Sequence, residues 1–166
     1  MRLLLPIGVA SSWVLRCVAA SIVDSSHGIP DLPLLFSMSI GLTAGPWVGA
    51  ATGFASGMLQ DLAIGRYLGL NALGTGVAGY LAGIAGARLF REGAVVPAAV
   101  GFGGSLAADA TRLLILWCAG SRISMVGRLP MLLKAALLNC LLMPVVYSLT
   151  MRAVTAVRHS REREVA

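Results

Sequence analysis

Residues 30–86 read PDLPLLFSMSIGLTAGPWVGAATGFASGMLQDLAIGRYLGLNALGTGVAGYLAGIAG, and the fold depends on this stretch. Within it, glycine recurs at every fourth position and a carboxylate takes the next place in the series: Gly45, Gly49, Gly53, Gly57 and Asp61. Positions four apart lie on one face of a helix. The pattern therefore predicts a smooth glycine face that another helix can approach closely, as small residues permit in a membrane.

Composition places the chain in a lipid bilayer. Of its 166 residues, 57% are hydrophobic and only 12% are charged, and the mean hydropathy is +0.84. A soluble domain carries about 25% charged residues, so this chain has too few charges to cover a water-facing surface. Its net charge of +6 does not form a basic stripe interleaved with aromatic residues, so we expect no binding to nucleic acid.

Six apolar segments follow one another along the chain. Their approximate limits are 3–23, 31–45, 46–64, 69–89, 94–119 and 130–151. Crossing the hydrocarbon core takes about 20 residues, so segment 31–45 is the shortest candidate, and whether it spans fully stays open. We predict an all-α integral membrane protein, with a six-helix transmembrane bundle over residues 1–151 and a short basic cytoplasmic tail over residues 152–166.

The distribution of Lys and Arg predicts the orientation of these spans. With six spans, the inner side holds seven arginines: Arg2, Arg88, Arg91, Arg152, Arg158, Arg161 and Arg163. The outer side holds Arg66, Arg122, Arg128 and Lys134. This asymmetry favours a cytoplasmic location for both termini.

A second glycine series, Gly79 and Gly83, lies in segment 69–89 at the same four-residue spacing. Small faces of this kind serve close packing within one chain and contact with another chain equally well. Packing inside the bundle, contact with a partner protein and formation of a homodimer therefore all stay open for the glycines in both series.

Four ionisable residues fall inside the predicted spans: Arg16, Asp61, Asp109 and Arg112. At 1.5 Å per residue each lies about 20 Å or more from the inner edge, which places all four in the outer half of the membrane. Charges in lipid usually face the bundle interior and are often paired. Asp109 and Arg112 are three apart and can meet, and Asp61 is expected to pair with Arg16 or Arg112. The cluster either fixes helix register or offers a polar docking point to a partner's membrane segment.

Asn71 stands at the start of segment 69–89, where its side chain is expected to accept a hydrogen bond from free backbone N–H groups.

Signatures of catalysis and of metal binding are missing from the sequence. The cysteines Cys17, Cys118 and Cys140 lie in apolar segments and form no pair with metal-ligand spacing. Ser25, Ser26 and His27 are adjacent in a loop, without the positioned base and orienting group that a nucleophile needs. We predict no enzyme activity, no metal and no cofactor.

Several motifs together resemble those of one known family, the rod shape-determining protein MreD. They are Pro30-Asp31-Leu32, Gly45-Pro46, the run from Gly49 to Asp61 (GAATGFASGMLQD), Leu68-Gly69-Leu70-Asn71-Ala72-Leu73 and Gly79-Tyr80-Leu81-Ala82-Gly83. Their order and spacing cover about a third of the chain. The remaining segments are similar only in being hydrophobic spans of suitable number.

The resemblance implies a non-catalytic protein of the bacterial inner membrane that acts in the elongation machinery of the lateral cell wall. It implies MreC as the main partner, with RodA, a class B penicillin-binding transpeptidase and, indirectly, the actin-like MreB. The family also resembles the six-helix S-components of energy-coupling-factor importers. An S-component that binds a vitamin-like solute is therefore the alternative function.

Overall fold

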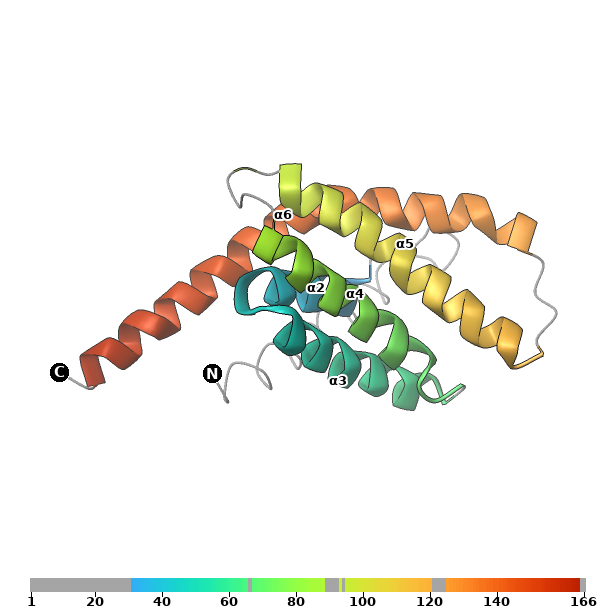
Figure 1. Cartoon of the computed structure of the whole chain (residues 1–166), viewed down its shortest axis with the longest axis horizontal. Coiled ribbons are helices and arrows are strands. Elements are labelled where there is room, and N and C mark those ends of the chain that lie inside the picture. The colour runs from blue at the N-terminus through green and yellow to red at the C-terminus, as the bar shows by residue number, and fades with distance from the viewer. Residues whose placement is uncertain (1–30, 66, 89–92, 94, 121–124, 165–166) are drawn as a thin grey trace.

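The computed structural model describes residues 31–65, 67–88, 93, 95–120 and 125–164 (Figure 1). In this part of the chain every regular element is an α-helix: α2 (Leu32–Ala44), α3 (Pro46–Ile64), α4 (Leu70–Arg88), α5 (Val95–Cys118) and α6 (Met125–Glu164). The all-α prediction is confirmed, but the described residues hold five helices, so the count of six is not supported. The predicted segment 3–23 lies outside the described residues.

Three of these helices are long and apolar enough to cross a membrane: α4, α5 and the Leu129–Arg152 part of α6. The predicted spans 31–45 and 46–64 are not among them. α2 is apolar but has only 13 residues, about 20 Å at 1.5 Å per residue, which is less than the roughly 30 Å of the hydrocarbon core. α3 has 19 residues, many of them glycine, alanine or polar.

Local sequence signals explain where the first helices begin and end. The Asp31 carboxylate accepts a hydrogen bond from the Leu34 N–H at 3.4 Å and so caps α2. Gly45 separates α2 from α3 with φ +100°, a conformation that favours glycine. α3 has the predicted limits, and those of α2, α4 and α5 differ from prediction by one residue at each end.

α6 is much longer than the predicted segment 130–151. It begins at Met125 and continues to Glu164, through most of the stretch that was predicted to be a tail. After Pro144 the sequence contains no glycine or proline to end a helix. Its 40 residues measure about 60 Å, roughly twice the hydrocarbon core. Figure 1 shows that α6 bends and that its C-terminal part extends away from the other helices.

The short helix α2 lies at the centre of the bundle and contacts each of the other four helices. Four of its side chains, Leu34, Leu35, Met38 and Leu42, are buried in the core with residues of α4, α5 and α6. A helix that is surrounded by other helices does not need to match the thickness of the bilayer. This placement accounts for the length of α2.

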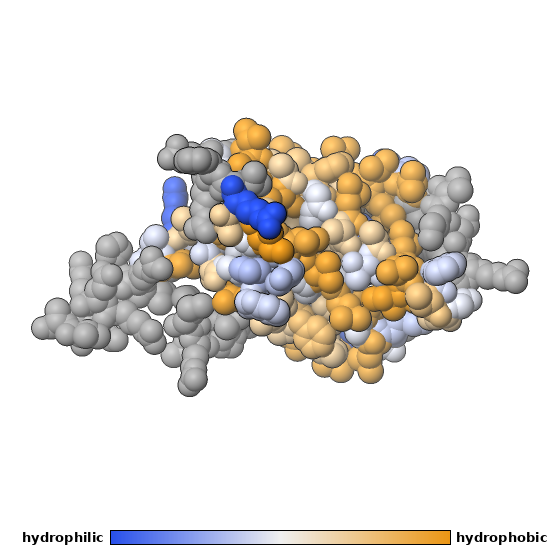
Figure 2. All heavy atoms as spheres, in the orientation of Figure 1, coloured by the Kyte–Doolittle hydropathy of each residue, from blue (hydrophilic) through white to orange (hydrophobic). Residues whose placement is uncertain are grey.

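The outer surface of the bundle is largely apolar. Leu62 on α3, Leu114 on α5 and Leu141 on α6 are each at least 59% exposed. Apolar colours cover most of the coloured face in Figure 2. Contiguous exposed apolar surface of this extent marks contact with lipid or protein.

Candidate functional site

The glycine face of α3 packs directly on the backbone of α4. A methyl group added at Gly53 would meet the carbonyl group of Thr75 and lie 3.0 Å from the Cα of Gly76. One added at Gly57 would lie 2.6 Å from the Cα of Ala72. Real Cβ atoms essentially never approach other atoms so closely, so only glycine permits this contact.

The same packing continues at the other end of the α3–α4 pair, where α2 joins it. A methyl group at Gly49 would lie 2.6 Å from the Cα of Gly41 on α2 and would also meet the carbonyl oxygen of Gly79. A methyl group at Gly83 would meet the backbone of Pro46. In this structure the predicted glycine faces are therefore covered by helices of the same chain.

Gly45 differs from the other glycines of its series. It lies in the turn before α3, where an added methyl group would meet nothing within 4 Å. The turn requires glycine at this position because of its φ of +100°. The placement of Gly45 on the helical face is therefore wrong, because the helix begins only at Pro46.

Asp61 is fully buried near the end of α3, and its carboxylate contacts the start of α4. Its carboxylate accepts backbone N–H groups of Gly69 at 2.9 Å, Asn71 at 3.1 Å and Ala72 at 3.1 Å. The first N–H groups of a helix lack partners within the helix and carry a partial positive charge. Asp61 satisfies them across the turn and ties α3 to α4.

Asn71 lies in the first turn of α4, next to this carboxylate. Its side-chain amide donates to Asp61 Oδ1 at 2.9 Å. The capping acceptor at this helix start is therefore Asp61, and the Asn71 side chain acts as a donor. The sequence prediction that Asn71 accepts the backbone bonds is not what the structure shows.

Arg112 forms the centre of a second polar cluster, which joins α5 to the start of α2. Its Nη1 donates to Asp109 and its Nη2 to Asp31, each at 2.9 Å. The three side chains are 14–17% exposed. The predicted contact of Asp109 with Arg112 is present, but the structure joins Arg112 to Asp31 and not to Asp61. Arg16 lies outside the described residues.

Three neutral side chains that the sequence analysis did not select complete this cluster. Gln60 on α3 donates to Asp31 Oδ1 at 3.2 Å. Asn139 on α6 accepts from the Asp31 N–H at 3.3 Å and donates to Ser105 on α5 at 2.9 Å. A polar amide inside an apolar segment was the available signal, because such groups need partners when they are buried.

Two buried atoms of the cluster have no hydrogen-bond partner in the described part of the chain: Gln60 Oε1 and Arg112 Nε. Gly74 on α4 makes room for the arginine, since a methyl group there would lie 3.1 Å from Arg112 Cγ and Nε. The cluster thus links α2, α3, α5 and α6 through side chains and packs on α4 through a glycine.

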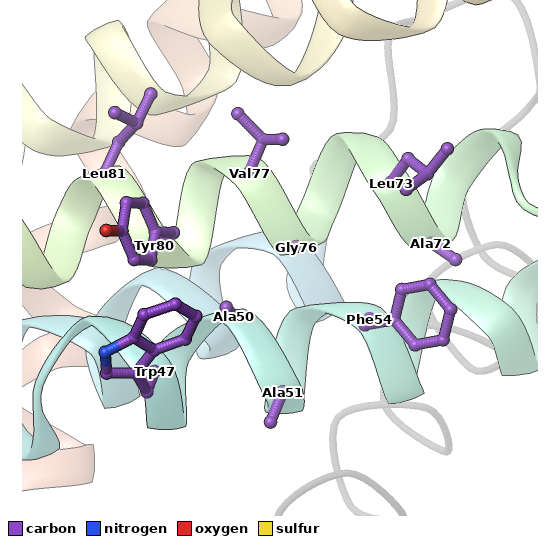
Figure 3. A pocket seen from close by; sticks show the side chains of 10 residues that line it. All are labelled: Trp47, Ala50, Ala51, Phe54, Ala72, Leu73, Gly76, Val77, Tyr80 and Leu81. Carbon is purple, nitrogen blue, oxygen red and sulfur yellow. The ribbon is translucent and has the colours of Figure 1, made fainter.

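An apolar groove of about 510 Å³ runs along the outer side of the α3–α4 pair (Figure 3). Its lining comes from both helices: Trp47, Ala50, Ala51, Phe54, Ala72, Leu73, Gly76, Val77, Tyr80 and Leu81. The rings of Trp47 and Tyr80 meet edge to face, with their centroids 5.4 Å apart. Ala50 and Gly76 are small residues that lie between the larger side chains of the lining, and the groove opens to the outside of the pair of helices.

The polar side chains around Asp61 and around Arg112 bond to one another and to nearby backbone groups. No set of three or more His, Cys, Asp or Glu side chains that could hold a metal ion occurs among the described residues. The group around Asp61 consists of hydrogen bonds from α3 to the start of α4. The group around Arg112 contains one ion pair within α5 and one to Asp31 at the start of α2. Such an arrangement fixes which helices meet and in which register.

Comparison with known proteins identifies the family. A family model described as rod shape-determining protein MreD matches residues 1–153. Searches of curated proteins and of solved structures find no match. The family match covers nearly the whole chain, including the glycine faces and both polar clusters, and the apolar helices agree with a membrane protein. The chain therefore belongs to the rod shape-determining protein MreD family.

Proposed function

We propose that this protein is a non-catalytic scaffold of the bacterial rod complex, located in the inner membrane with both termini in the cytoplasm. In this proposal it binds MreC and so supports lateral peptidoglycan synthesis by RodA and a class B penicillin-binding transpeptidase, with MreB engaged indirectly. The observation that carries the proposal is the family match over residues 1–153, which gives the chain a role in rod shape determination.

The buried polar side chains of the described residues support the proposed scaffold role, because they bond to groups within the chain. Asp61, Arg112 and Asn139 all bond to groups on other helices or across a turn. Groups engaged in this way hold the bundle together. A protein that works by binding others needs such a fixed shape, because rigid surfaces lose less freedom on binding.

The glycine faces are used inside the chain, so we expect MreC to bind a surface that stays open. The groove between α3 and α4 is the candidate. It presents the aromatic rings of Trp47, Phe54 and Tyr80 beside small residues. Aromatic side chains are enriched at protein interfaces, and small residues let a second helix approach closely in a membrane.

Affinity purification of a tagged chain from mildly crosslinked native membranes, followed by mass spectrometry, tests both statements. We expect the unaltered chain to recover MreC together with the wall-synthesis enzymes. Gly76→Leu places a side chain in the groove, and the first added carbon meets only ordinary contacts at 3.5–3.7 Å. This variant should therefore insert normally and recover several-fold less MreC.

Gly103→Leu is the matched control, because Gly103 on α5 lies away from the groove and has open space beside it. It should recover as much MreC as the unaltered chain. Equal recovery by the two leucine variants would contradict the groove as the binding surface. Recovery of ATP-binding-cassette ATPases and a coupling subunit in place of MreC would contradict the scaffold and support the solute-importer alternative.

A further inference from the structure

The turn between α3 and α4 is tied at both ends to one residue. The Gly65 N–H donates to the main-chain carbonyl of Asp61 at 2.9 Å, and the Gly69 N–H donates to the Asp61 carboxylate at 2.9 Å. Tyr67 lies midway between these two glycines, and its carbonyl accepts the Leu70 N–H at 3.1 Å. Because Asp61 is fully buried, the turn has a fixed position, and Tyr67 lies at its tip.

Tyr67 has an unusual backbone conformation for a residue of its size. Among the described residues it is the only one other than glycine with a positive φ, which is +50°. Glycine adopts such angles easily, whereas a bulky residue rarely does. Packing inside the fold does not explain the tyrosine, because Tyr67 is 56% exposed and its hydroxyl makes no hydrogen bond to another described residue. A strained residue with an exposed side chain indicates a contact outside the chain.

The position of the turn indicates what this contact is. α4 begins at Leu70 and has 19 residues, about 28 Å, which is close to the roughly 30 Å of the hydrocarbon core. α4 is also apolar enough to cross a membrane, so its ends lie near the two surfaces of that core. Tyr67 is three residues before α4. It therefore lies close to one of these surfaces, where acyl chains meet lipid headgroups.

The side chains around Tyr67 are those of a surface that faces lipid. Leu62 before the turn, Leu68 within it and Leu73 after it are 60%, 67% and 47% exposed. Exposed apolar side chains thus lead from both helices up to the turn. Tyr67 adds an apolar ring that ends in a polar hydroxyl, and side chains of this kind are enriched at the boundary between acyl chains and headgroups.

We propose that Tyr67 and Leu68 form a membrane anchor at the tip of the α3–α4 turn. The Leu68 side chain and the Tyr67 ring contact acyl chains, and the Tyr67 hydroxyl bonds to lipid headgroups. Since Asp61 fixes the turn, this contact holds the α3–α4 pair at a defined depth in the bilayer. The anchor needs no partner protein, and it works on either side of the membrane.

Depth-dependent fluorescence quenching in lipid vesicles tests the anchor. Trp13, Trp47 and Trp117 are replaced by phenylalanine, and Tyr67→Trp then supplies the single reporter. The purified full chain is reconstituted into phosphatidylcholine vesicles that carry a nitroxide on the headgroup, near the headgroup end of the acyl chain or near its methyl end. We expect the first two nitroxides to quench the reporter roughly twofold more strongly than the third, because interfacial aromatic rings lie at headgroup level.

Leu106→Trp in the same background is the control for a deep position, because Leu106 is exposed near the middle of α5. The nitroxide near the methyl end should quench it most strongly. If Tyr67→Trp does not fold, Leu68→Trp reports on the same tip and should give the interfacial pattern. A tip reporter that no nitroxide quenches would lie in water, and one quenched like Leu106→Trp would lie in the core. Either result would overturn the proposal.

Discussion

Helices α2, α3 and α4 pack through their backbones, whereas α5 and α6 pack through side chains. In the first region, Gly49, Gly53 and Gly57 bring main chains together so closely that no Cβ fits between them. In the second region, the buried Met143 side chain fills the space beside Gly101, and Asn139 bonds to Ser105. A substitution should therefore be tolerated better between α5 and α6 than between α3 and α4, because a flexible side chain can move aside and a backbone cannot.

The two regions are also joined differently. Within the first region, Asp61 locks α3 to α4 across a short turn. Between the regions, Arg112 reaches from α5 to Asp31 at the start of α2. The first region is therefore stabilised by hydrogen bonds between neighbouring helices, and Arg112 forms an ion pair between the two regions.

The largest effect is expected from Gly53→Leu. The added side chain starts at a point already occupied by the Thr75 carbonyl group, so α3 and α4 cannot approach. We expect the detergent-solubilised protein to lose its monodisperse peak in size-exclusion chromatography. Gly103→Leu, on a face of α5 with nothing within 4 Å, should elute normally. Equally sharp peaks for both variants would contradict the backbone packing.

Removal of the link between the regions comes next. Arg112→Met leaves Asp31 and Asp109 without the guanidinium that they share. Loss of one partner of a buried ion pair costs about 3–5 kcal/mol. Thermal unfolding in detergent should show this loss, while Arg88→Met at the exposed end of α4 should shift the melting temperature very little. Similar shifts for both arginines would mean that the cluster does not hold the regions together.

Asp61→Ala should have a smaller effect, confined to the first region. It leaves the N–H groups of Gly69, Asn71 and Ala72 without their acceptor, at a cost of about 2 kcal/mol. Hydrogen exchange followed by mass spectrometry should show faster exchange at the start of α4. Leu62→Ala, at an exposed neighbouring position, is the control. Unchanged exchange in Asp61→Ala would show that the Asp61 carboxylate does not hold the start of α4 in place.

The smallest effects come from a pair of glycine-to-alanine changes. At Gly49 the new methyl group meets backbone atoms of Gly79 and Gly41, whereas at Gly104 it meets the flexible end of Met38. We expect Gly49→Ala to lose about 1–3 kcal/mol, as overpacking does, and Gly104→Ala to lose less than about 1 kcal/mol, because Met adapts its shape. Denaturant titration of both proteins in detergent compares them. Equal losses would remove the distinction between rigid and adaptable contacts.

Local patterns in the sequence were enough to predict much of the first region. The four-residue glycine spacing predicted the faces of α3 and α4, and the predicted segment 46–64 has the same limits as α3. The spacing of Asp109 and Arg112 predicted their contact on α5. Each of these features is set by residues close together in the chain, within one helix or one turn.

Contacts between distant segments could not be predicted in this way. The bond from Arg112 to Asp31 joins residues 81 positions apart, and nothing in either local sequence selects the other. Asp61 was expected to pair with Arg16 or Arg112 because acids in membranes usually pair with a cation. In the described residues it accepts free N–H groups of α4, and Arg112 bonds to Asp31 and Asp109. From the sequence, segment 31–45 was only the shortest candidate span. The central position of α2 could not be predicted, because it depends on contacts with four other helices.

The most direct test concerns the purpose of the glycine face and uses the purified chain without any partner. Gly53→Ala adds a methyl group against the backbone of Thr75, whereas Gly76→Ala, in the same pair of helices, meets only ordinary contacts at 3.5 Å or more. We expect Gly53→Ala to lower the melting temperature by roughly 5 °C or more and Gly76→Ala to leave it nearly unchanged. Equal melting temperatures for the two proteins would show that the glycine face does not hold this chain together.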